Sequence, residues 1–167
     1  VGKSGHGAMP HTAVDSVLIA AQLITGLQSI VSRSVNPIEP AVLTIGRMEG
    51  GERRNVIAHK TRLEGTIRAF RQEIYDLIKE RMVAYGSGLE MAHGCQVNFT
   101  FRDMYPAVNN DEHLTHELIQ CLEAEQLIKV DPIMLAEDFA YYQQVVPGVF
   151  FLLGCGNETK GFCNPLH

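Results

Sequence analysis

The feature that most constrains the fold is the order in which two hydrophobic periodicities alternate along residues 1–104. Apolar residues recur at three- and four-residue steps over 14–31 and again over 71–90, which predicts two amphipathic helices. Apolar–polar alternation and turn signals predict strands over 1–8, 41–48, 55–70 and 97–101. The order β-α-β-β-α-β is typical of a ferredoxin-like α+β domain, in which two helices pack on one face of an antiparallel sheet.

Local signals define the ends of the two helices. Thr12 followed by Asp15 predicts the N-terminal cap of the first helix, and Asn36-Pro37 predicts its end. Gly94 stands where a glycine cap is expected after the second helix. Residues 1–104 are therefore expected to form a complete domain.

Residues 105–167 have a different character. We expect a helix over 111–126, a strand near 130–135, a short helix over 136–142 and a strand over 148–154 that is buried on both faces. These few elements make a poor core by themselves. We therefore expect 105–167 to be an incomplete α/β segment, and the chain to be a piece of a larger protein.

Composition and charge exclude several classes of function. The net charge is −5, whereas nucleic-acid binders usually carry a basic face, so no nucleic-acid partner is expected. The four cysteines form no C-x-x-C pair, which favours free thiols and a cytoplasmic location. No uninterrupted apolar run approaches the about 20 residues of a membrane helix, so no membrane partner is expected.

Four candidate residues are ambiguous when each is taken alone. His6 lies between two glycines and could donate to a developing oxyanion, or it could be an ordinary turn residue. Asn55 could bind a ligand or simply cap a turn. Arg68 carries a forked guanidinium that suits a carboxylate, although a strand arginine more often forms a surface ion pair. His167, the last residue, means nothing by itself.

Two further groups have strong structural explanations. His113 and His116 are three residues apart on a helix and could share a metal, but exposed helix faces carry such pairs by chance. Glu137 and Asp138 open a helix, where acidic residues are favoured electrostatically.

Five segments in this order resemble the aminoacylase and hippurate hydrolase family of co-catalytic metallopeptidases. Each segment is weak alone, but the combination covers essentially the whole chain. The segments are residues 2–11 (GKSGHGAMPH), Gly50-Gly51 with 55–57 (NVI), 64–70 (EGTIRAF), 137–154 and 165–167 (PLH).

The resemblance implies a two-domain amidohydrolase. A dimerising lid is inserted into a zinc-peptidase-like catalytic domain, so 1–104 would be the lid and 105–167 the C-terminal part of the catalytic domain. Two divalent ions (Zn, Mn, Co or Ni) and a glutamate base would activate water. The water would then cleave the amide of an N-acyl amino acid, whose acyl group would be acetyl, benzoyl or similar.

The resemblance also implies residue roles. His6 would reach into the partner subunit's site and stabilise the oxyanion, Asn55 would hydrogen-bond the substrate, Arg68 would bind its carboxylate and His167 would ligate one metal. The other ligands and the base would come from outside this segment. The chain alone is therefore expected to hold no stable metal pair and to be inactive. The family pattern is broken at Arg53-Arg54 and Ala58-His59.

Two alternative functions remain open. One is a self-contained ferredoxin-like module for dimerisation or small-molecule binding, without catalysis. The other is an RNA binder that stacks bases on Phe99 and Phe101, which the missing basic stripe disfavours. A homodimer is expected because ferredoxin-like lids pair readily through a sheet edge or helix face.

Overall fold

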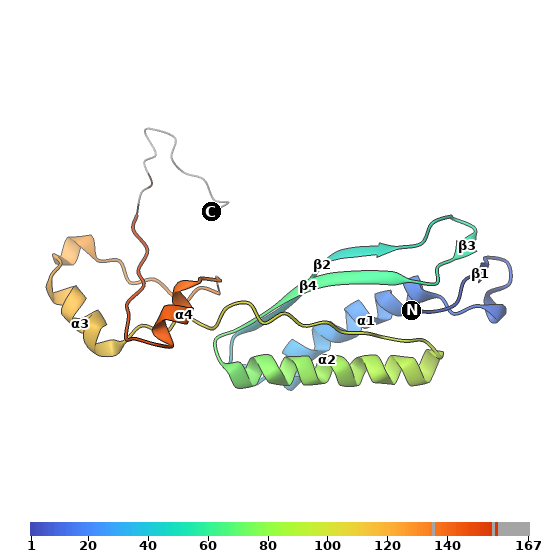
Figure 1. Cartoon of the computed structure of the whole chain (residues 1–167), viewed down its shortest axis with the longest axis horizontal. Coiled ribbons are helices and arrows are strands. Elements are labelled where there is room, and N and C mark those ends of the chain that lie inside the picture. Colours follow the sequence, from blue (N-terminus) through green and yellow to red (C-terminus); the bar gives the residue numbers. More distant parts are fainter. Residues whose placement is uncertain (135, 155, 157–167) are drawn as a thin grey trace. The chain divides into compact units, whose positions relative to one another are not determined.

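The chain divides into two compact units, Val1–Met104 and Tyr105–His167. The computed structural model describes residues 1–134, 136–154 and 156 (Figure 1). The first unit combines helices and strands, and the described part of the second contains helices and irregular segments. The α+β class expected from the sequence is confirmed.

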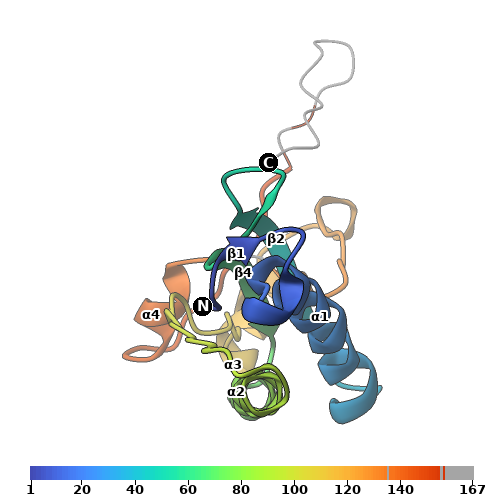
Figure 2. The same ribbon diagram turned by 90° about the vertical axis from the view of Figure 1, so that its right-hand side faces the viewer.

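Two long helices form one layer of the first unit (Figures 1 and 2). They are α1, Ser16–Ser29, and α2, Gln72–His93. The helix α2 ends at Gly94, whose φ of 64° lies in the left-handed region that glycine adopts without strain. The C-terminal cap predicted at Gly94 is therefore confirmed.

The helix α1 begins at a different cap from the one expected. The carboxylate of Asp15 accepts hydrogen bonds from the amides of Val17 at 2.9 Å and Leu18 at 3.2 Å, so Asp15 is the N-cap. The prediction of Thr12 was wrong because Pro10–Thr12 forms a separate 3-10 turn, η1.

The helical stretch Ser16–Ser34 includes α1 and a π-helical turn, η2, at Ile30–Ser34. By length and composition it is apolar enough to cross a membrane, which corrects the expectation based on uninterrupted apolar runs. Its inward-facing residues nevertheless lie in the buried core of the first unit: Ile19, Leu23, Leu27 and Ile30. A core helix of a globular domain passes the same test of length and composition.

The second layer is a long antiparallel hairpin. The strand β2, Ala41–Gly50, pairs with β4, Thr61–Ala69, with a register shift between Ile45 and Arg47. Leu43 and Ile67 lie directly opposite one another and pack into the core with the two helices. Because side chains alternate between faces, this pairing gives the hairpin one buried face.

The strand predicted over 55–70 is interrupted at its start. A short strand, β3, Val56–Ile57, pairs with β1, Gly5–His6, and β4 begins only at Thr61. The break arises because the Ala58 carbonyl accepts hydrogen bonds from Ser16, from its amide at 3.1 Å and its hydroxyl at 2.8 Å. The start of α1 is thereby fastened to the β3–β4 connection.

The core of the first unit lies between the helices and the hairpin. Ile78 is 0% exposed and Leu27 is 1% exposed, and burying such a side chain contributes roughly 1.5–3 kcal/mol. Nine buried residues make up this core: Ile19, Leu23, Leu27, Ile30, Val35, Leu43, Ile78, Met82 and Leu89.

The strand predicted over 97–101 does not form a ladder. Val1 and Gln96 exchange two backbone hydrogen bonds, at 2.6 and 2.8 Å, but the described residues show no continuation of this pairing. The predicted alternation of buried and exposed side chains is nevertheless present, because Val97, Phe99 and Phe101 pack against the core. The two phenyl rings are thus turned toward the helices, which weighs against an RNA-stacking platform.

The described part of the second unit contains three helices. They are α3, Glu112–Gln120, the 3-10 turn η3, Ala124–Gln126, and α4, Phe139–Gln143. The helix predicted over 111–126 is therefore interrupted.

Neither strand predicted in the second unit is present in the described residues of 130–135 and 148–154. Residues 151–154 are exposed, with Leu153 at 82%. A strand buried on both faces needs neighbouring strands. The described residues of this unit supply none.

Candidate functional site

His6 and Asn55, which are far apart in the sequence, are brought together by the pairing of β1 with β3. In this pairing Gly5 lies opposite Ile57 and His6 lies opposite Val56. Just beyond it, the Gly7 amide donates to the Asn55 carbonyl at 2.8 Å. The backbone therefore holds these two candidate residues at one end of the first unit.

The glycine-rich start of the chain permits this arrangement. The Gly2 amide donates to the His59 carbonyl at 2.6 Å, and Lys3 forms an isolated antiparallel bridge with Val14. A Cβ on Gly2 would lie 2.2 Å from the Val14 carbonyl oxygen, which is an impossible contact. A side chain at position 2 would therefore displace the segment that carries His6.

A shallow hollow of about 240 Å³ lies beside this pairing. It is lined by Gly7 and Asp15 with two arginines and neighbouring residues: Val17, Gly51, Arg53, Arg54, Val56, Ile57 and Ala58. The Asp15 carboxylate is already engaged in capping α1. The two arginines therefore give this surface a positive character.

Arg68 is at the other end of the hairpin. It pairs with Val42 and lies seven positions after Thr61 along β4. At a rise of roughly 3.3 Å per residue, this places Arg68 about 23 Å from Thr61 along the strand. Within one copy of the chain, Arg68 is therefore not brought to His6 and Asn55.

The described residues do not by themselves provide a two-metal centre. They contain no group of three or more His, Cys, Asp or Glu side chains that could hold a metal ion. His167, expected as a ligand, lies outside the described residues.

The two histidines on α3 interact with neighbours on the same helix. His113 Nδ1 lies 3.7 Å from the Glu117 carboxylate, and His116 Nε2 lies 2.8 Å from the Gln120 amide. Both contacts join residues one helical turn apart. A shared metal at His113 and His116 gains no support from this geometry.

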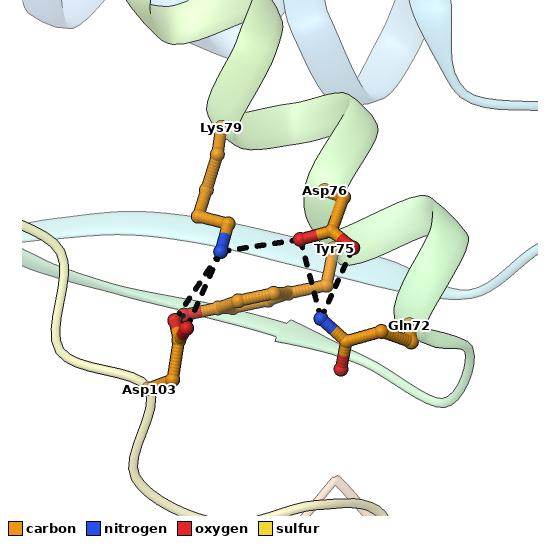
Figure 3. A network of polar contacts seen from close by, with 5 residues as sticks. All are labelled: Gln72, Tyr75, Asp76, Lys79 and Asp103. Atoms are coloured by element: carbon orange, nitrogen blue, oxygen red, sulfur yellow. Dashed lines mark hydrogen bonds and ion pairs between the residues drawn. The ribbon is translucent and has the colours of Figure 1, made fainter.

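A polar network on α2, which the sequence did not indicate, fastens the end of the first unit (Figure 3). The Tyr75 hydroxyl donates to Asp103 at 2.8 Å, and the Lys79 ammonium donates to Asp103 at 3.3 Å and lies 3.1 Å from Asp76. Lys79 also lies 4.5 Å from the centre of the Tyr75 ring, which adds a cation–π contact. We interpret this network as structural, because its polar groups form hydrogen bonds and ion pairs with one another.

The network shifts three pKa values in the directions expected from its contacts. The hydrogen bond from Tyr75, then that from Lys79, lowers the pKa of Asp103. Partial burial, then the hydrogen bond to Asp103, raises the pKa of Tyr75. The hydrogen bond to Asp76 is the main cause that raises the pKa of Lys79.

A second polar cluster that the sequence did not indicate joins three separate parts of the second unit, at residues 110, 143 and 148–150. The Asn110 side chain pairs with the backbone of Phe150, donating to its carbonyl at 2.8 Å and accepting from its amide at 2.9 Å. The Gln143 amide donates to Asn110 at 3.3 Å and to the Gly148 carbonyl at 3.0 Å. The Asn110 side chain thus satisfies both backbone groups of Phe150, as the backbone of a paired strand would.

This chain is similar in sequence and fold to known proteins. Residues 1–87 match the peptidase dimerisation domain of the M20 family. The N-acetyldiaminopimelate deacetylases of Anoxybacillus flavithermus and a Geobacillus species are 45% identical over 157 residues and 46% identical over 156 residues. Each alignment covers 92% of this chain and 42% of the relative, so the chain spans about two fifths of these relatives.

Two solved structures extend the comparison. A crystal structure described as that of an aminohydrolase from methicillin-resistant Staphylococcus aureus superposes with a TM-score of 0.77 at 33% identity, over 87% of this chain and 39% of that one. The YxeP protein of Bacillus subtilis, a dinuclear metal-binding peptidase of the M20 family, has a TM-score of 0.67 at 28% identity, over 89% and 38%. The chain therefore belongs to the M20 family of peptidases and amidohydrolases, with the peptidase dimerisation domain at residues 1–87.

Proposed function

We propose that this chain is the lid and the C-terminal catalytic segment of a metal-dependent amidohydrolase that cleaves N-acyl amino acids. Membership of the M20 family supports hydrolytic chemistry. Relatives named N-acetyldiaminopimelate deacetylase favour an acetyl over a benzoyl group, and an amino acid such as diaminopimelate as the product. Residues 1–104 would be the lid and 105–167 the catalytic segment.

The observation that carries the proposal is the separation of Arg68 from His6 and Asn55. The pairing of β1 with β3 holds His6 and Asn55 at one end of the lid, and Arg68 lies near the far end of β4. Three residues that serve one small substrate must converge on it. This separation fits a site assembled from two copies, with Arg68 from one and His6 and Asn55 from the other.

Each residue would then act by its own chemistry. A His6 ring N–H would donate to the oxyanion that develops when water attacks the amide. The Asn55 amide would hydrogen-bond the substrate, and the Arg68 guanidinium would bind its carboxylate through two parallel hydrogen bonds.

The metal centre belongs to the proposal for the larger enzyme. It would hold two divalent ions (Zn, Mn, Co or Ni), with His167 as one ligand. The described residues hold no such group of donors, so no chemical step is assigned to the ions. We expect the 167-residue chain alone to bind no metal pair stably and to be inactive.

Assembly and location complete the proposal. The dimerisation-domain match supports a homodimer formed through the lid. The free thiols of Cys95 and Cys121 support a cytoplasmic location. We propose neither a nucleic-acid nor a membrane partner.

A non-catalytic dimerisation module is the second candidate function. One observation favours it: the match to the family model covers the dimerisation domain alone and ends at residue 87. It shares the expected homodimer with the first candidate, so only an activity measurement separates the two.

A chimeric enzyme provides that measurement. This chain would replace the matching segment of the Anoxybacillus flavithermus deacetylase, and acetate release from N-acetyldiaminopimelate would be measured with added Mn²⁺ or Zn²⁺. We expect hydrolysis by the chimera, none by the 167-residue chain, and a roughly 10²–10³-fold lower kcat for the His6→Ala chimera. A folded, dimeric chimera that hydrolyses neither this substrate nor N-benzoylglycine would favour the module.

A further inference from the structure

The turn that follows β1 holds His6 through three successive backbone amides. The Gly7 amide donates to the Asn55 carbonyl at 2.8 Å, and the Met9 amide donates to the His6 carbonyl at 2.8 Å, which closes a four-residue turn. The amide between them, that of Ala8, donates to Nδ1 of the His6 ring at 3.2 Å.

The turn is also braced from both sides. A Cβ on Gly7 would stand 3.1 Å from the Asn55 carbonyl oxygen, so position 7 is pressed closely against β3. On the other side the Thr12 hydroxyl donates to the Met9 carbonyl at 2.9 Å. The backbone that presents the Ala8 amide is therefore fixed from both directions.

From this geometry we propose that the Ala8 amide is a positioning group, which fixes His6 as the neutral tautomer with its proton on Nε2. A neutral imidazole carries one N–H, and a nitrogen that accepts a hydrogen bond carries none. The contact from Ala8 to Nδ1 therefore leaves the proton on Nε2. The catalytic consequence rests on the proposed function.

The tautomer matters because only one of the two can stabilise an oxyanion. With the proton on Nε2, the outer edge of the ring offers a hydrogen-bond donor without the ring becoming charged. With the proton on Nδ1, the same edge would offer a lone pair and repel a developing negative charge. One neutral hydrogen bond shifts the ratio of two tautomers by about two- to twelve-fold.

The test is a long-range ¹H–¹⁵N correlation spectrum of the histidine rings in the 167-residue chain, recorded at alkaline pH where the rings are neutral. The His6 signals are assigned as those missing from the His6→Gln variant. We expect Nδ1 to resonate as an unprotonated ring nitrogen and Nε2 as a protonated one. Signals that show the proton on Nδ1 would overturn the proposal without any further variant.

A backbone variant isolates the Ala8 contact. Replacing Ala8 by lactic acid turns its amide into an ester, which removes the N–H donor and keeps the methyl side chain. The matched control is the corresponding ester at Met9, which loosens the turn but keeps the Ala8 donor. We expect the tautomer ratio of His6 to fall about two- to twelve-fold in the Ala8 ester and to stay unchanged in the Met9 ester. Equal ratios in all three proteins would overturn the proposal.

These results do not depend on hydrolysis, so they remain interpretable if the proposed activity fails. The same Ala8 ester, introduced into the chimeric enzyme, allows a second measurement, that of kcat. If kcat stays unchanged although the measured population of the tautomer protonated on Nε2 has fallen, the tautomer is fixed by Ala8 but has no catalytic consequence, which would also overturn the proposal. We expect kcat to fall in proportion to the population of the tautomer protonated on Nε2.

Discussion

Gly26 of α1 packs directly against the ring of Tyr85 on α2. A Cβ at position 26 would lie 1.9 Å from the ring carbon that carries the Tyr85 hydroxyl, and 2.0 Å from the hydroxyl oxygen. The place of the Tyr85 ring against α1 in the first unit therefore depends on the absence of a side chain at this one position.

Gly26→Ala should destabilise the first unit by about 1–3 kcal/mol, because the Tyr85 ring must move out of its place between the helices. Urea unfolding measures the loss. The matched control is Gly88→Ala on α2, where a Cβ meets nothing within 4 Å. That control should gain about 0.5–1 kcal/mol from helix propensity. Equal stabilities for the two variants would show that Gly26 is not needed for helix packing.

Asp15→Ala should cost about 0.5–2 kcal/mol, because the first amides of α1 lose their acceptor. Asp15→Asn keeps an acceptor oxygen and should retain most of the stability. Thr12→Val serves as the control for the turn η1. A larger loss in Thr12→Val than in Asp15→Ala, measured by urea unfolding, would contradict the assignment of Asp15 as the cap.

Asp103 should make the stability of the first unit fall in acid. Its pKa is lowered in the folded state, so its contribution is present above the unfolded value, about 3.9, and is lost as the pH falls through the lower folded value. The difference in unfolding free energy between the wild type and Asp103→Asn should therefore shrink between pH 6 and pH 2.5.

Tyr75→Phe tests the cause of this shift, because it removes the hydrogen bond that lowers the Asp103 pKa most and leaves Lys79 in place. The Asp103 carboxyl, followed by ¹³C NMR, should then titrate at a higher pH than in the wild type. An unchanged titration would mean that the Tyr75 hydrogen bond does not form in solution.

Asn110→Ala should loosen the second unit locally. It leaves the Phe150 amide and carbonyl without their side-chain partner, at a cost of about 1–3 kcal/mol. Hydrogen exchange at the Phe150 amide should accelerate accordingly. Asn109→Ala is the matched control, since Asn109 contributes only its backbone amide to Gln143. Equal exchange in the two variants would argue against the Asn110 contact.

Hydrophobic periodicity predicted the elements of the first unit well where the local sequence preference and the tertiary packing favour the same structure. The apolar stripes of α1 and α2 face the core, and Gly94 has the left-handed conformation that a helix-ending glycine commonly adopts. Resemblance through short motifs identified the amidohydrolase family correctly. Its finer implications, including the roles of His6, Asn55, Arg68 and His167, stay predictions.

The errors occur where a distant partner decides the structure. Ser16 takes the Ala58 carbonyl out of the expected long strand, and no pattern within 55–70 contains that information. The apolar run at 148–154 reads as a buried strand, but the described residues offer it no neighbouring strand. The contacts of Asn110 with Phe150 and of Tyr75 with Asp103 join residues 28 or more positions apart, so spacing could not reveal them.

Complementation between two inactive variants tests the shared site most directly. In the chimeric enzyme, His6→Ala and Arg68→Ala should each lose nearly all activity, because each removes a residue from every site. A mixed dimer would hold one site with both residues intact. After subunit exchange at equal amounts, about a quarter of the wild-type activity should return, since half of the dimers are mixed and each has one intact site. Mixed dimers that form, as seen by native mass spectrometry, but remain inactive would contradict a site built from two copies of the chain.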